Sequence, residues 1–149
     1  MAHTRKRHIA DIIIKRARLW PVIGILGPRQ SGKSTLLRQI LQPHFKASYH
    51  TMDSESLKSK ALRAPALFLE SLDAGKNTVI IDEVQKVPVL FDAIKQAVDE
   101  SRRPGKYIIS GSTEFSKKTG ICESLTGRIG LFALQPMTIA ETLELPPSA

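Results

Sequence analysis

The sequence has 149 residues, with 22 Lys and Arg against 14 Asp and Glu, a formal net charge of +8 and a pI near 9.9. Its apolar share of 42% and charged share of 24% suit one soluble globular domain and exclude a disordered or collagen-like protein. The single Cys122 excludes an internal disulfide and a cysteine-based zinc site, and without an apolar run of signal-peptide or membrane-spanning length we expect a cytoplasmic protein.

Apolar periodicity predicts strands that alternate with helices along the chain. We expect strands at 22–26, 48–52, 78–81, 107–110 and 129–134. We expect helices at 8–18, at 34–41 and at 65–73, and Pro43 should end the second of these. Two more helices should begin after an N-cap at Asp53 or Ser54 and after Pro88. This alternation predicts an α/β fold, a three-layer α/β/α sandwich with a mainly parallel five-stranded sheet, in which ligands bind beyond the carboxyl ends of the strands.

A phosphate-binding motif follows the first predicted strand. Residues 27–35 read GPRQSGKST and satisfy G-x-x-x-x-G-K-[ST], the Walker A pattern, between an apolar strand and an amphipathic helix. Backbone N–H groups of such a loop cradle phosphates at a helix N-terminus, Lys33 can reach the β- and γ-phosphates, and Ser34 can bind Mg²⁺. The predicted nucleotide-binding residues are Gly27, Pro28, Arg29, Gln30, Ser31, Gly32, Lys33, Ser34 and Thr35.

Two acids end the strand predicted at 78–81. Carboxylates beside a buried strand need a charged or metal partner, so we expect Asp82 to hold Mg²⁺ together with Ser34, as in the Walker B element of P-loop NTPases. Glu83 would polarise the attacking water as a general base. The alternative is a pair of acids that cap the following helix.

Two further residues are weaker candidates for catalysis. Ser112 follows the strand at 107–110 and could sense the γ-phosphate or orient water; we prefer it to Ser110, which can still belong to the strand. Its alternative is a hydrogen-bonded turn around Gly111. Arg128 could stabilise charge on the transferred phosphoryl group, in its own subunit or in a neighbour's, or could be a surface arginine paired with Glu123 or Glu141.

The positive charge is concentrated near the start of the chain, since residues 1–50 hold ten Lys and Arg against one Asp. Such a segment could attract nucleic acid, an acidic partner, anionic lipid or the phosphates of a nucleotide, or could simply be a solvated helix face and tail. Nucleic acid binding therefore stays open as an alternative, and its test is a steep salt dependence that is lost when Arg5, Lys6 and Arg7 are neutralised.

Together these motifs resemble a family of AAA/STAND-like P-loop ATPases over nearly the whole chain. The matching stretches are GPRQSGKS (27–34), IIDEVQKVP (80–88), ISGST (109–113), ESLTGR (123–128) and QPMTIAE (135–141). The resemblance implies nucleotide, magnesium and catalytic roles for Lys33, Ser34, Asp82 and Glu83. It also implies sensor-like roles for Ser112 and Arg128, with Gln85 as a motif residue of unassigned role.

The chain also departs from the family pattern. Ser replaces the usual Thr at positions 34 and 110, which keeps a hydroxyl at each. Because this sequence continues for only eight residues after Glu141, we expect it to lack the family's helical lid and C-terminal domain of unknown or nuclease-like character. We therefore expect a basic tail at 1–18, an ATPase core at 19–141 and a shortened end at 142–149.

The function expected from these residues is Mg²⁺-dependent ATP binding and hydrolysis, which drives a conformational switch in a partner or in a missing domain. The alternatives are a regulatory or nucleic-acid-binding module that binds nucleotide without efficient turnover, and a small-molecule kinase. A GTPase is disfavoured because the sequence contains no N-K-x-D motif.

Overall fold

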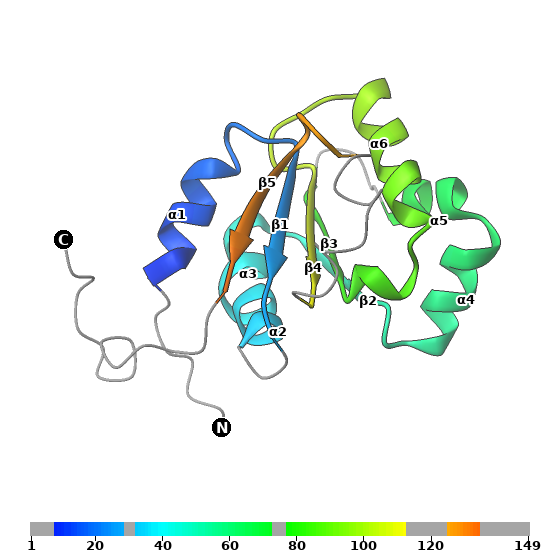
Figure 1. The fold of residues 1–149 in the computed structure, drawn as a ribbon, viewed down its shortest axis with the longest axis horizontal. Coiled ribbons are helices and arrows are strands. Elements are labelled where there is room, and N and C mark those ends of the chain that lie inside the picture. Colours follow the sequence, from blue (N-terminus) through cyan, green and yellow to red (C-terminus); the bar gives the residue numbers. More distant parts are fainter. Residues whose placement is uncertain (1–7, 29–31, 73–76, 113–124, 135–149) are drawn as a thin grey trace.

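The computed structural model describes residues 8–28, 32–72, 77–112 and 125–134. Its five strands form one parallel sheet in the order β2-β3-β4-β1-β5 (Figure 1). The strands are β1 (Val22–Leu26), β2 (Ser48–Thr51), β3 (Val79–Asp82), β4 (Tyr107–Gly111) and β5 (Ile129–Ala133). The predicted α/β fold with a five-stranded parallel sheet is therefore confirmed.

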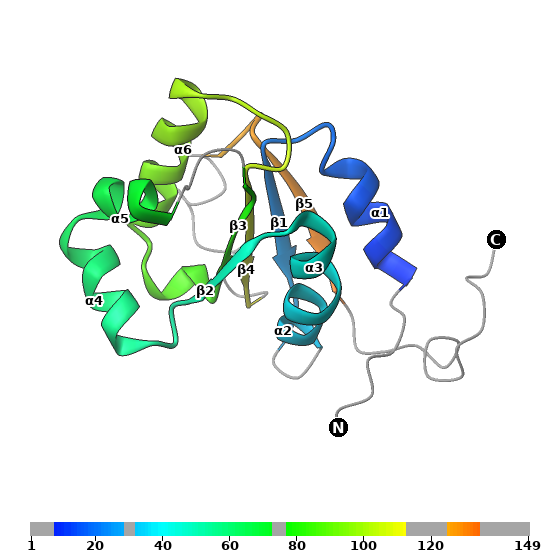
Figure 2. The same ribbon diagram turned by 180° about the vertical axis from the view of Figure 1, so that it is seen from behind.

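Helices cover both faces of the sheet, as Figures 1 and 2 show from opposite sides. One face carries α1 (His8–Arg16) and a helical segment made of α2 (Lys33–Thr35), the π-helical η1 (Leu36–Leu41) and α3 (Gln42–Phe45). The other face carries α4 (Glu55–Arg63), α5 (Pro65–Leu72) and α6 (Leu90–Glu100), with the short 3-10 helix η2 (Val84–Lys86) between β3 and α6. In the described part of the chain, no helix has the length and apolarity needed to cross a membrane.

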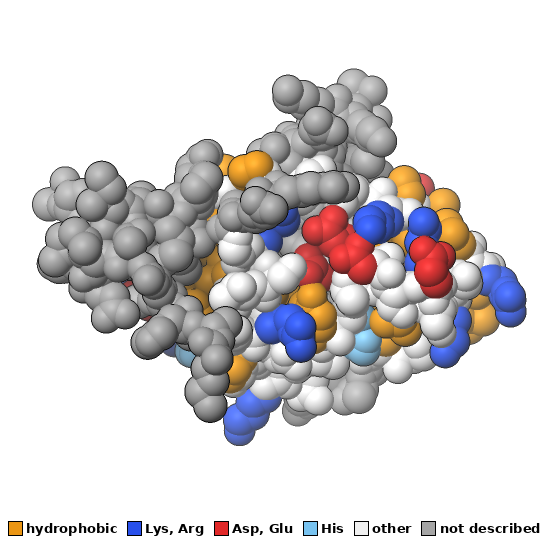
Figure 3. Space-filling view, turned by 90° about the horizontal axis from the view of Figure 1, so that it is seen from below, with side chains coloured by type: hydrophobic (Ala, Val, Ile, Leu, Met, Phe, Trp, Pro, Cys, Tyr) orange, Lys and Arg blue, Asp and Glu red, His pale blue; other side chains and the backbone are white. Residues whose placement is uncertain are grey.

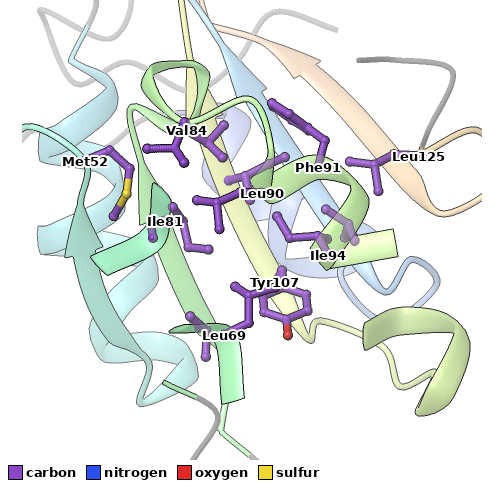
Figure 4. Close-up of a cluster of buried hydrophobic side chains, with 14 of the residues drawn as sticks. Met52, Leu69, Ile81, Val84, Leu90, Phe91, Ile94, Tyr107 and Leu125 are labelled. Atoms are coloured by element: carbon purple, nitrogen blue, oxygen red, sulfur yellow. The ribbon is translucent and has the colours of Figure 1, made fainter. Parts of the chain in front are cut away.

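The core lies in two layers because the central strands bury both of their faces. Along β3, Val79 and Ile81 pack toward α4, α5 and α6, whereas Ile80 packs toward α1 and η1. Figure 4 shows the first of these clusters, in which Tyr107 of β4 lies among aliphatic side chains from the helices. A strand that is buried on both faces reads as a continuous apolar run, which explains why β1, β3 and β4 are recognisable in the sequence.

The prediction that Pro43 ends the helix after the phosphate loop is wrong. The helix continues through Pro43 to Phe45 and ends at Lys46, which has a left-handed φ of 51°. The turn before Pro43 is π-helical, and this wider turn accommodates a ring that offers no N–H to the helical hydrogen bonds.

The other helix starts lie close to the predicted ones. Ser54 is the N-cap of α4, since its hydroxyl accepts a hydrogen bond from the backbone N–H of Leu57 at 3.4 Å. Pro88 lies in the turn before α6, which begins at Leu90, so the proline precedes the helix rather than occupying its first turn.

Candidate nucleotide site

The sheet order brings the two predicted motifs to the same edge. β4 lies between β1 and β3, with Gly111 beside Leu26 and Ile109 beside Ile81. The phosphate loop and the acid pair therefore flank the end of β4. Figure 3 shows this edge, where acidic side chains gather centrally with Lys and Arg side chains around them.

The described part of the phosphate loop holds a buried ammonium group. Lys33 is 7% exposed, and its Nζ donates hydrogen bonds to the carbonyl oxygens of Gly27 at 2.8 Å and Pro28 at 3.2 Å. Gly32 precedes it with a φ of 87°, a conformation that side chains other than glycine rarely adopt. Because its partners among the described residues are neutral carbonyls, the positive charge of Lys33 is suited to an incoming anion.

The structure describes some of the other motif residues and not the rest. Thr35 lies exposed at the end of α2. Arg29, Gln30 and Ser31, and the basic residues at 5–7, lie outside the described residues, so their predicted contacts with phosphate or nucleic acid stay predictions.

Asp82, at the end of β3, is the centre of a hydrogen-bond network. It is 1% exposed, and its Oδ2 accepts hydrogen bonds from the hydroxyls of Ser34, at 2.8 Å, and Tyr49. Its Oδ1 accepts a hydrogen bond from the Ser110 hydroxyl. Three hydroxyl groups from three different elements therefore hold one buried carboxylate, which satisfies the need of a buried charge for hydrogen bonds.

Glu83 follows Asp82 in an unusual backbone conformation. Its φ of 58° is left-handed, which is uncommon for a residue other than glycine, and its backbone N–H donates to Ser110 Oγ at 3.2 Å. The Gln85 amide donates to Glu83 Oε2 at 2.6 Å, while the buried Gln85 Oε1 has no hydrogen-bond partner among the residues that the structure describes. The left-handed turn places the two neighbouring acids in different surroundings, one buried and one half-buried at the edge.

Tyr49 is a site residue that the sequence analysis missed. It lies on β2, next to β3, with the Arg38 guanidinium 5.3 Å from its ring centroid. Burial, then the hydrogen bond to Asp82 and the negative charge there, raises the pKa of Tyr49 above its ordinary value. The expected strand at 48–52 was the available signal, but periodicity does not reveal which strand will be its neighbour.

The structure places Ser110, rather than Ser112, against the acids. Ser110 is the fourth residue of β4 and is buried, and its hydroxyl bonds both Asp82 and the Glu83 backbone. The preference for Ser112 assumed that a strand residue would not reach the site. Because the carboxyl ends of β3 and β4 are adjacent, a side chain still within the strand reaches its neighbour. A role for Ser112, which is half-buried after the strand, stays a prediction.

The structure places Arg128 at the opposite end of the sheet from the phosphate loop of its own chain. Its carbonyl accepts a hydrogen bond from Val22 N–H at the amino ends of β1 and β5. β5 has five residues that each rise about 3.3 Å, so Arg128 lies roughly 16 Å from the loop edge. Its guanidinium instead forms two hydrogen bonds with Asp99, at 2.6 and 3.0 Å. A contact with a neighbouring subunit's nucleotide stays a prediction.

The residues at the loop edge fit Mg²⁺ and a nucleotide. A hydroxyl oxygen and a carboxylate oxygen are the hard ligands that Mg²⁺ prefers, and Ser34 and Asp82 present them 2.8 Å apart. No group of three or more His, Cys, Asp or Glu side chains among the described residues could hold a metal ion. Mg²⁺ commonly takes one or two protein carboxylates and completes its shell with phosphate and water.

Comparison with protein families agrees with this geometry. The family model of the AAA domain matches residues 20–143. The chain belongs to the AAA-domain family. It is an AAA-like P-loop ATPase domain, with the parallel sheet and flanking helices described above.

Known relatives place this AAA domain within longer proteins. It is 34% identical over 122 residues to uncharacterized proteins Mb2031c of Mycobacterium bovis and Rv2008c of Mycobacterium tuberculosis, a match that covers 81% of this chain and 26% of each relative. The chain thus spans about a quarter of the length of these relatives. The structure of C. elegans PCH-2 shares the fold, with a TM-score of 0.53 and 18% identity over 85% of this chain and 41% of PCH-2.

Proposed function

We propose that this AAA domain binds ATP with Mg²⁺ and hydrolyses it, and that the nucleotide state drives a conformational change in an adjoining domain or partner. The observation that carries the proposal is the 2.8 Å hydrogen bond from Ser34 to Asp82. It joins the helix that follows the phosphate loop to the acid that ends β3. The length of the curated relatives supports an adjoining domain as the recipient.

The proposed roles follow from the surroundings of each residue. Loop 27–35 would bind the phosphates through backbone N–H groups and Lys33, while Ser34 and Asp82 would hold the cation. Bound Mg²⁺ neutralises charge that develops on the phosphates. Catalysis in this site would be positioning and electrostatic stabilisation, since phosphoryl transfer needs no covalent intermediate with the protein.

Glu83 is the proposed general base. Its half-buried position supports this role, because a base must receive a proton from water. The Gln85 amide bonds one carboxylate oxygen and so orients the side chain. The rare φ of 58° also supports a functional role, since strained backbone is concentrated at such sites.

The test is phosphate release measured with ATP, with GTP and without nucleotide, each with and without Mg²⁺, beside a titration with a fluorescent ATP analogue. We expect release with ATP and Mg²⁺. Lys33→Ala should weaken binding strongly, because the variant lacks the cation of the phosphate loop. A matched control is Lys46→Ala, which removes an exposed lysine beyond the end of α3. Equal binding by the wild type and Lys33→Ala would contradict the proposal.

A further inference from the structure

Tyr49 contacts the proposed metal-binding acid from an edge strand that no recognised motif includes. We propose that Tyr49 is a positioning residue for the cation: its hydroxyl holds the Asp82 carboxylate in the orientation that receives Mg²⁺, so that Tyr49 sets how strongly Mg²⁺ promotes nucleotide binding. This inference rests on the proposed function and assigns a residue to the same site.

The three hydroxyl groups that donate to Asp82 differ in the carboxylate oxygen that they bond and in their other proposed roles. Ser34 and Tyr49 share Oδ2, while Ser110 bonds Oδ1. Ser34 is itself a proposed ligand of the cation, and its hydroxyl is then needed there. Tyr49 is the remaining described donor on Oδ2, so it would keep the carboxylate oriented when Ser34 turns to the metal.

Packing makes Tyr49 a fixed donor. Its ring packs against the cluster formed by α1, η1 and the sheet, and Arg38 of η1 lies over the ring. A phenol has an ordinary pKa of about 10 and therefore carries its proton at neutral pH. The hydroxyl can therefore donate a hydrogen bond at neutral pH, and the sheet fixes the position of the ring that carries it.

The expected size of the effect follows from how metal ligands behave. A ligating carboxylate is oriented by hydrogen bonds to its own partners, and loss of such a partner typically weakens metal affinity by about 10–100-fold. Tyr49→Phe removes the hydroxyl and leaves the packed ring. We therefore expect a defect in the response to Mg²⁺ without loss of the fold or of the phosphate loop.

The experiment compares wild type, Tyr49→Phe and Tyr107→Phe. The chain has two tyrosines, and Tyr107 is a matched control because it is buried at the first residue of β4, at the opposite end of the sheet. A fluorescent ATP analogue is titrated in EDTA and then at increasing Mg²⁺. In Tyr49→Phe we expect unchanged affinity in EDTA and a Mg²⁺ concentration for half-maximal effect raised by about 10-fold or more. Tyr107→Phe should match the wild type.

Either of two results for Tyr49→Phe would overturn the inference. A Tyr49→Phe variant with the wild-type Mg²⁺ response would show that the hydroxyl positions nothing, and a response at lower Mg²⁺ would show that it competes with the cation. A wild-type chain that binds no nucleotide in any condition would overturn the proposed function, and the inference with it. If Mg²⁺ promotes nucleotide binding by the wild type, the nucleotide-binding part of the proposed function holds, and the Tyr49→Phe result then tests the inference alone.

A double-mutant cycle separates positioning from a general effect on stability. In an Asp82→Asn background the carboxylate is gone, so Tyr49→Phe should cause no further loss of the Mg²⁺ response. A further loss equal to that in the wild-type background would overturn the inference. Thermal unfolding of each variant, without nucleotide, reports any change in the fold separately.

Discussion

The buried charged residues at the carboxyl edge of the sheet and the exposed ones at its amino edge have different kinds of partner. At the carboxyl edge, Asp82 and Lys33 are 1% and 7% exposed and are bonded to hydroxyls and carbonyls. At the amino edge, Arg128 and Asp99 form a two-point ion pair with side chains that are 25% and 46% exposed. Asp82 and Lys33 are therefore bonded to neutral groups at the carboxyl edge, whereas Arg128 and Asp99 pair with each other at the amino edge.

This difference shows which charges are available for a ligand. The pKa of Asp99 is lowered by its hydrogen bond with Arg128, and that of Arg128 is raised by the same bond, so each already has its counterion. Solvent screens such a pair, and exposed pairs typically stabilise a fold by only about 0–1 kcal/mol. Lys33 has no acidic partner among the described residues, so its charge can be matched by phosphate.

The largest effect is expected from Glu83→Gln at the carboxyl edge. The variant should still bind ATP but hydrolyse it about 10²–10⁴-fold more slowly, the range typical of losing a general base. Single-turnover phosphate release beside nucleotide titration measures the two separately. Asp53→Asn is the matched control, because Asp53 is an exposed acid whose carboxylate pairs with Lys86 rather than with the hydroxyls that bond Asp82. Normal turnover in Glu83→Gln would refute the assignment.

Ser110→Ala tests the buried network by stability. The change leaves Asp82 Oδ1 and the Glu83 N–H without the Ser110 hydroxyl, and such buried groups typically cost about 1–3 kcal/mol when unsatisfied. We expect a loss of that size in the free energy of unfolding, measured by urea denaturation. Ser112→Ala, outside the strand, should change it by less than about 0.5 kcal/mol. Equal effects would mean that Ser110 has no special place in the network.

His50, which follows Tyr49 on β2, should have a smaller effect, one that depends on pH and is seen in the free energy of unfolding. Its Nε2 is buried and has no hydrogen-bond partner within the described part of the chain, and burial lowers the pKa of His50. The unfolded chain therefore takes up this proton first as the pH falls through the ordinary value of about 6.5, and the free energy of unfolding falls with it. Urea denaturation at about pH 7.5 and about pH 5.5 should show a smaller fall in His50→Gln. An identical fall would mean that His50 does not contribute.

The smallest effect is expected at the amino edge. Arg128→Ala should lower the free energy of unfolding only slightly, because solvent screens the exposed pair, and should leave the chain's own nucleotide affinity unchanged. Asp99→Ala should behave alike, because the pair is one exposed unit. If Arg128→Ala bound nucleotide more weakly in a monomeric sample, the claim that only the carboxyl edge binds nucleotide would be wrong.

The sequence predicts much of the fold because its signals are local. Buried strands such as β1 and β3 read as apolar runs, and the phosphate loop and acid pair are contiguous motifs. The helix through Pro43 was not predictable, because a π-helical turn has no simple residue signature. The pairing of Arg128 was not predictable either, since its partner Asp99 is 29 residues away and any exposed acid is an equivalent candidate by sequence.

By itself, the sequence determines the family, the order of strands and helices along the chain, and the identity of Lys33, Ser34, Asp82 and Glu83 as candidates, because each depends on neighbours a few residues away. Only the tertiary structure decides that β4 lies between β1 and β3, and that Ser110 and Tyr49 meet at Asp82. The physical reason is that a buried carboxylate is satisfied by whichever hydroxyls the sheet places beside it. In a parallel sheet those donors come from strands that are distant in the sequence.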